Sequence, residues 1–85
     1  MKHTQESIAQ WCQSYVATLL GTTTDKISPD ASFDRIGVDS AIAVALLIEV
    51  EDRYGVDLPP EELFENPTIN AVAAYLFPRV ERDAA

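Results

Sequence analysis

The sequence predicts an all-α protein with three main helices, one short helix and a long first loop. Two observations carry this prediction. Apolar residues recur at helical spacing in three stretches, and each stretch is followed by glycine or proline. The alternation of apolar and polar residues that is typical of strands occurs nowhere along the chain. A chain of 85 residues is long enough for one domain with a single small core.

The first helix is predicted over residues 5–20, after a frayed end at residues 1–4. Gly21 follows the last periodic residue, as is usual where a helix ends. The apolar stripe of this helix consists of Ile8, Trp11, Cys12, Tyr15, Val16, Leu19 and Leu20. Residues 22–38 form a loop of turn-forming residues, interrupted by four apolar side chains that we expect to pin it onto the core. These four are Ile27, Phe33, Ile36 and Val38.

The second helix is predicted over residues 40–54, with Gly55 just beyond its end. Successive residues lie about 100° apart around a helix, which sorts this one into two sides. The side assigned to the core carries Ala43, Leu46, Leu47, Val50 and Tyr54. The outward side is an apolar patch edged with carboxylates, made of Ser40, Ala41, Val44, Ala45, Ile48, Glu49, Glu51 and Asp52.

The remainder of the chain predicts a short helix and a last long one. Pro59 and Pro60 lead into one or two helical turns over residues 61–65. Thr68 is a suitable N-cap for a last helix from Ile69 to about residue 77. Pro78 is expected to end that helix. The chain is thus predicted to be a single domain, residues 1–85, with a core over about 5–77 and a flexible tail over 78–85.

Composition narrows the classes of partner. Fourteen acidic and six basic residues give a net charge of −8, which disfavours nucleic acids and anionic membranes and suits partners with basic patches. The sequence has one cysteine, no apolar run long enough to cross a membrane and no signal-peptide core. We therefore expect a soluble, cytoplasmic, monomeric protein.

No self-sufficient active site is evident. A catalytic serine needs a base, and the only histidine, His3, lies in the terminus expected to be mobile. Cys12 lies on an apolar stripe, where packing is the simpler interpretation, and the spaced cysteines and histidines of a metal site are missing. Ser40 stands where the loop meets the second helix, so it is either a structural cap or a site for an anionic group at the positive end of the helix dipole.

Four stretches together resemble the acyl carrier protein family. They are residues 33–40 (FDRIGVDS), 51–56 (EDRYGV), 58–69 (LPPEELFENPTI) and 73–76 (AAYL). The resemblance covers about residues 8–76 and implies a four-helix bundle of the acyl-carrier kind. It also implies that Ser40 receives 4′-phosphopantetheine from coenzyme A, through a phosphopantetheinyl transferase that uses magnesium. The thiol of that arm would hold acyl groups as thioesters, and the protein itself would not be an enzyme.

The resemblance also suggests a partner face. Asp39 matches the acidic residue before the modified serine, and Glu51 and Asp52 match acidic positions that meet basic patches on partner enzymes. Such partners would be a ketosynthase, an acyltransferase or an adenylating ligase. Ala41 and Ala45 depart from the family, where leucine and an acidic residue are common, which favours a dedicated set of partners. Apolar contacts would then come from the remaining outward side chains, Val44 and Ile48.

Within the family, residues 59–69 look like carriers of polyketide and nonribosomal peptide pathways. Peptidyl carriers usually have Gly-His or a similar pair before the serine, so Asp39 favours an acyl carrier of polyketide or related biosynthesis. Three alternatives stay open. One is a peptidyl or aminoacyl carrier, one is an unmodified helical interaction module, and the weakest is a hydrolase or transferase that uses Ser40 or Cys12.

Overall fold

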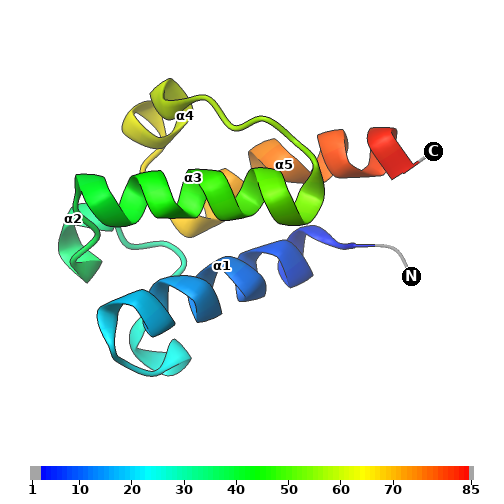
Figure 1. Ribbon diagram of the computed structural model, residues 1–85. Coiled ribbons are helices and arrows are strands. Elements are labelled where there is room, and N and C mark those ends of the chain that lie inside the picture. The colour runs from blue at the N-terminus through cyan, green and yellow to red at the C-terminus, as the bar shows by residue number, and fades with distance from the viewer. Residues whose placement is uncertain (1–2, 85) are drawn as a thin grey trace.

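The computed structural model describes residues 3–84, and it describes side chains as far as Val80. Over this range the fold is entirely helical, as predicted (Figure 1). The elements are α1 (Gln5–Leu20), the short 3-10 helix η1 (Thr24–Lys26), α2 (Phe33–Ile36), α3 (Ser40–Tyr54), α4 (Pro60–Glu65) and α5 (Ile69–Ala84). No helix in the described part of the chain is long and apolar enough to cross a membrane.

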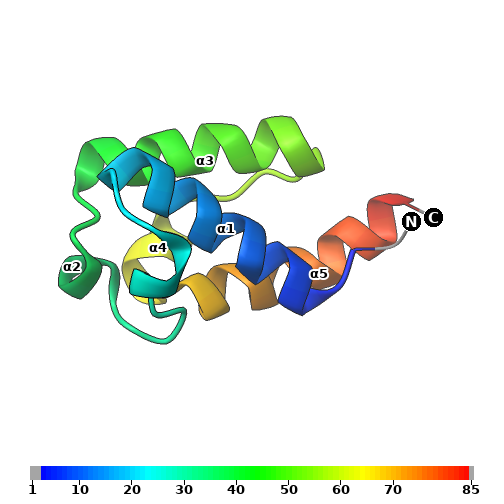
Figure 2. The same cartoon turned by 90° about the horizontal axis from the view of Figure 1, so that it is seen from below.

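Three long helices enclose the core. Figures 1 and 2 show α1, α3 and α5 running along one another, with α2 and α4 at the end where α3 begins. The largest of the side chains buried completely between them are Ile8, Cys12, Val16, Leu46, Val50, Ile69 and Leu76. Each buried large apolar side chain stabilises the fold by about 1.5–3 kcal/mol before entropy is counted, so this small set holds the bundle together.

The first helix has the predicted bounds but a slightly different buried face. Leu19, which the sequence places on the apolar stripe, is 40% exposed and is not part of the core. Trp11 and Tyr15 are only partly buried, while Ala9 and Ala17 lie in the core. Leu19 shares a side of α1 with the buried Ile8 and Cys12, so its exposure is local to the last turn of the helix.

The start of α1 is ordered by a local hydrogen-bond motif. Thr4 is the N-cap: its side-chain oxygen accepts from the backbone N–H of Ser7 at 2.9 Å, and Ser7 Oγ accepts from the Thr4 N–H at 2.9 Å. This reciprocal pair satisfies two N–H groups that a helix start otherwise leaves unpaired. The expectation of a frayed end is therefore wrong for Thr4, and the first two residues lie outside the described range.

The long loop is pinned to the core as predicted. Ile27, Phe33 and Val38 are buried, and Ile36 packs against them. Backbone hydrogen bonds fasten the same loop to the start of α5: the Phe33 N–H donates to the Pro67 carbonyl at 2.8 Å, and the Asn70 N–H donates to the Pro29 carbonyl at 3.0 Å. The loop also contains η1 and α2, which sequence periodicity did not reveal because each is at most one turn long.

The last helix begins as predicted and ends later. Thr68 caps it by accepting from the Ala71 N–H at 3.1 Å. The predicted end at Pro78 is wrong, because α5 continues through the proline to Ala84. A proline inside a helix removes one hydrogen bond and costs about 3 kcal/mol. Burial of Val80, which is 6% exposed, and a hydrogen bond of 2.7 Å from Arg79 Nη1 to the Tyr75 carbonyl help to offset that cost.

Candidate functional site

The loop before α3 leads into Asp39 and Ser40, and these two residues have different roles at the start of the helix. Gly37 ends α2 with a φ of 92°, a left-handed conformation that glycine adopts without strain and that redirects the chain. Asp39 is the N-cap of α3, and its Oδ1 accepts a hydrogen bond from the Ile42 N–H at 3.0 Å. Ser40 is therefore the first residue inside the helix. The interpretation of Ser40 as the structural cap is wrong, because its neighbour fills that position.

The hydroxyl of Ser40 is left available. Ser40 is exposed, and among residues 3–80 no side chain or backbone group forms a hydrogen bond with its Oγ. It lies at the positive end of the dipole of a 15-residue helix, where a negatively charged substituent is stabilised by about 0.3–1 kcal/mol. An exposed oxygen in this position suits the attachment of a phosphate ester, so the residues present fit a phosphopantetheine arm.

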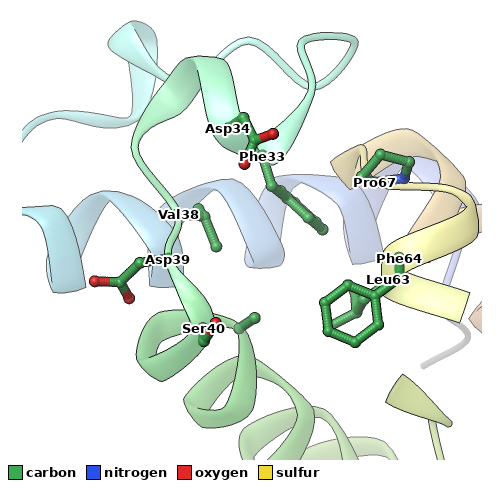
Figure 3. A pocket seen from close by; sticks show the side chains of 9 residues that line it. Phe33, Asp34, Val38, Asp39, Ser40, Leu63, Phe64 and Pro67 are labelled. Carbon is green, nitrogen blue, oxygen red and sulfur yellow. The ribbon is translucent and has the colours of Figure 1, made fainter. Parts of the chain in front are cut away.

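A surface groove opens beside Ser40 (Figure 3). Its volume is about 330 Å³, and it lies between the α2–α3 segment and α4. The lining residues are Phe33, Asp34, Val38, Asp39, Ser40, Ala43, Leu63, Phe64 and Pro67. The groove could not be predicted from the sequence, because it depends on how the short α4 sits against α3.

Helix α4 explains why the groove has an aromatic rim. Pro60 occupies its first turn, where the missing N–H costs nothing. Leu63 is 3% exposed and fixes the helix to the core, whereas the adjacent Phe64 is 75% exposed. A helix of six residues can bury only one side of itself, so two consecutive large apolar residues cannot both reach the core. The adjacency of Leu63 and Phe64 in a short helix was therefore the sequence signal from which an exposed aromatic side chain could have been predicted.

The predicted partner face lies along the outward side of α3. Val44 and Ile48 are 52% and 61% exposed, although valine and isoleucine are among the residues most often buried in proteins. Asp39 differs from the rest of the predicted set because its carboxylate is occupied as a cap. Of the other predicted residues, Ala45 is partly exposed, and Ala41, Glu51 and Asp52 are exposed.

The structure separates Ser40 from the groups that a serine hydrolase needs. His3 packs edge-on against the ring of Tyr54 with the ring centroids 5.0 Å apart. Tyr54 ends α3 and Ser40 begins it, which places them about 20 Å apart at roughly 1.5 Å per residue. Cys12 is fully buried, and burial raises the pKa of its thiol to about 12, so it is a packing residue as expected.

Comparison with known proteins identifies the class. The family model described as the phosphopantetheine attachment site matches residues 10–76. The chain therefore belongs to the family of phosphopantetheine-binding carrier proteins, and the resemblance seen in the sequence is confirmed. Members of this family carry intermediates and do not catalyse their conversion, in agreement with the prediction that the protein is not an enzyme.

Two relatives show the range of proteins that contain this module. The chain is 38% identical over 84 residues to a phenolphthiocerol/phthiocerol polyketide synthase of Mycobacterium tuberculosis. The matched region covers 95% of this chain and 4% of that protein. It thus spans only a small part of that relative's length. It is also 34% identical over 77 residues to the acyl carrier protein of Rhodococcus erythropolis, covering 89% of this chain and 85% of that one.

Solved structures agree on the fold. A free-standing peptidyl carrier protein from a secondary metabolic pathway of Acinetobacter baumannii superposes with a TM-score of 0.83 at 30% identity, covering 89% of this chain and 95% of the other. The HMG-ACPI domain of the CurA module from Lyngbya majuscula gives a TM-score of 0.88 at 21% identity, covering 99% and 85% of the two chains. The second likeness concerns the fold alone. The predicted acyl-carrier-like bundle is confirmed.

Proposed function

We propose that Ser40 is the attachment point of 4′-phosphopantetheine and that residues 1–85 act as a single acyl carrier domain. The observation that carries this proposal is the exposed Ser40 hydroxyl at the start of α3, which is free because Asp39 supplies the cap. Ser40 is the hydroxyl-bearing residue of the α2–α3 segment that lies at the N-terminus of a long helix. When bound, the arm supplies a thiol that holds acyl groups as thioesters.

The chain's own part in the attachment is small. Ser40 Oγ would attack the phosphate of coenzyme A next to the pantetheine; an Oγ–P bond forms as the bond to the departing adenosine bisphosphate breaks. The hydroxyl proton would pass to a base of the transferase, since no histidine of the described chain lies near Ser40. The start of α3 orients the serine oxygen and stabilises the negative charge that it then bears.

The outward side of α3 is the proposed meeting point with partner enzymes. The face comprises Asp39, Ala41, Val44, Ala45, Ile48, Glu51 and Asp52. Exposed apolar side chains rimmed by carboxylates suit an apolar site with a basic rim on a phosphopantetheinyl transferase or a synthase enzyme. A ketosynthase, an acyltransferase or an adenylating ligase would each have to present such a site.

A polyketide or related pathway is the proposed setting. The identity to a polyketide synthase, 38% over 84 residues, supports it, as does the acidic residue at position 39. A peptidyl or aminoacyl carrier is the second candidate, favoured by the likeness to the free-standing peptidyl carrier protein. Loading assays with acyl and aminoacyl donors from both kinds of pathway would distinguish the two.

The proposal is tested by incubating the protein with coenzyme A, magnesium and a broad-specificity transferase. Intact mass should rise by one phosphopantetheine for the wild type and stay unchanged for Ser40→Ala. An unmodified interaction module would instead show no mass gain, and its binding to partners would survive Ser40→Ala. Equal gains in both proteins would place the attachment elsewhere and refute the assignment.

A further inference from the structure

An aromatic patch that carries an arginine lies between α1 and α3, away from Ser40. Trp11 and Tyr15 are one turn apart on α1, and their rings are stacked with centroids 5.4 Å apart and an interplanar angle of 8°. The Trp11 ring also meets the ring of Tyr54 edge-on at 5.5 Å. The Arg53 guanidinium lies over Trp11, 5.2 Å from the ring centroid. Trp11, Tyr15 and Arg53 together form the α1–α3 patch.

The outer surface of this patch is not used by the core. Trp11 and Tyr15 are only partly buried, whereas the residues that follow them, Cys12 and Val16, are fully buried. Arg53 is exposed. Tryptophan, tyrosine and arginine are the residue types most enriched among the side chains that dominate binding between proteins. Because stacking already fixes both rings, a partner that covers them has little further side-chain motion to restrict, which lowers the cost of binding.

The positive charge of Arg53 is not neutralised within the described chain. Glu49 precedes Arg53 by one turn of α3, a spacing at which glutamate and a basic residue often pair. The Arg53 side chain instead lies against aromatic rings, 5.2 Å from the centroid of Trp11 and 5.6 Å from that of Tyr54. Among residues 3–80 no carboxylate forms an ion pair with its guanidinium. A guanidinium has five N–H donors, so it can bind a carboxylate of another molecule through two of them.

The charge pattern of the patch differs from that of the outward side of α3. Burial, and after it the charge of Glu49, raises the pKa of the Tyr15 phenol, in keeping with a carboxylate near that ring. A positive charge therefore lies at Trp11 and a negative one near Tyr15. A uniformly basic partner surface is repelled at Arg53. A segment that offers a carboxylate to Arg53 and an apolar side chain to the rings is complementary to the patch.

We propose that the α1–α3 patch is a docking surface for a segment of a partner protein that presents a carboxylate next to an apolar side chain. Arg53 lies about 20 Å along α3 from Ser40, at roughly 1.5 Å per residue. A protein bound to the patch therefore leaves Ser40 accessible, so that one partner can hold the carrier while another acts at its serine. This inference goes beyond the proposed function, because the patch belongs to the unmodified chain.

The test selects ligands for the unmodified protein from a phage-displayed library of short random peptides. Peptides that also bind Tyr15→Ala are removed first, which eliminates ligands of the outward side of α3. The remaining peptides should share an aspartate or glutamate next to an apolar residue. Arg53→Gln should weaken their binding about tenfold, and replacing the peptide carboxylate by an amide should then have no further effect. The indole N–H signal of Trp11 should shift on binding.

Arg35→Gln is the matched control, because Arg35 is also exposed but lies on α2. This variant should bind the peptides as the wild type does. The proposal would be overturned if no peptides remain, if they lack a carboxylate, or if Arg53→Gln binds them equally well. A dimer in sedimentation equilibrium that Arg53→Gln abolishes would also overturn it, since the occupant would be a second copy of this chain. These outcomes are independent of Ser40 modification, so the proposed function is tested separately.

Discussion

Asp39 and Ser40 are consecutive residues whose side chains the fold uses differently. The carboxylate of Asp39 satisfies the Ile42 N–H, and the hydroxyl of Ser40 stays outside the hydrogen bonding of the helix. Aspartate and serine are equally good caps, so composition alone could not decide which of them held the helix. The backbone decides it, because Asp39 has the extended conformation of a cap and Ser40 is the first helical residue.

Asp39→Ala should lower the free energy of unfolding by about 1 kcal/mol, because the Ile42 N–H loses its acceptor. Asp39→Asn should cost only a few tenths of that amount, since an asparagine oxygen caps nearly as well. Urea denaturation of the three proteins measures both differences. Similar losses in the two variants would show that the charge of Asp39, and not its cap, stabilises the fold.

Cys12 should make stability depend on alkaline pH. Burial raises the pKa of its thiol from 9.0 to about 12, so above pH 9 the unfolded chain releases a proton that the folded protein retains. The contribution to stability is complete below pH 9 and declines as the pH rises towards 12, by at most about 1.4 kcal/mol per pH unit.

The measurement is the urea midpoint of wild type and Cys12→Ala over the alkaline range. The variant should be less stable at neutral pH and show a shallower decline. Burial also raises the pKa of Tyr15 and Tyr54. The comparison cancels the contribution of Tyr15, which both proteins contain, whereas the charge of the Cys12 thiolate also raises the pKa of Tyr54 and this coupling is absent from the variant. Parallel curves would contradict a protonated, buried thiol.

At the scale of elements, periodicity predicted the long helices and failed on the short ones. The bounds of α1 and α3 follow from apolar spacing and from Gly21 and Gly55, which end them in left-handed conformations. The four residues of α2 are too few to show a period. Proline usually ends a helix, but α5 continues through Pro78 because of tertiary packing, which a sequence pattern does not contain.

Val80 provides the test of that packing. Val80→Ala should lower the free energy of unfolding by about 1–3 kcal/mol, because a buried side chain beyond Pro78 loses its contacts with the core. Leu19→Ala, at a position 40% exposed, should change it by less than about 0.5 kcal/mol. Thermal and urea unfolding measure both. A neutral Val80→Ala would mean that α5 contributes nothing to the core beyond the proline.

At the scale of the whole molecule, the features of the candidate functional site gather at one end. Ser40, the groove and Phe64 lie together where α3 begins. Figure 1 shows the first turn of α1 and the last turn of α5 at the other end. The place of Ser40 at the start of a helix and the outward side of α3 could be predicted from the sequence, since both are local to one helix. The groove could not be predicted, because three separate segments form it together. The net charge of −8 favours partners with basic surfaces.

Modification should therefore depend on salt. Raising the ionic strength shortens the reach of charge interactions to about 3 Å at 1 M, so the KM for the carrier in the transferase reaction should rise. The double variant Glu51→Gln with Asp52→Asn should raise KM at low salt and weaken its salt dependence. Glu6→Gln with Asp25→Asn removes the same charge away from α3 and is the control. Equal effects of the two pairs would argue for net charge instead of a defined face.

The most direct measurement is the position of the phosphopantetheine on the modified protein, found by tandem mass spectrometry of its peptides. We predict a single adduct on Ser40. Ser14 and Ser28 are also exposed and serve as internal controls that should stay unmodified. An adduct on either of them, or none on Ser40 after complete reaction with coenzyme A and transferase, would contradict the assignment of Ser40 as the attachment point.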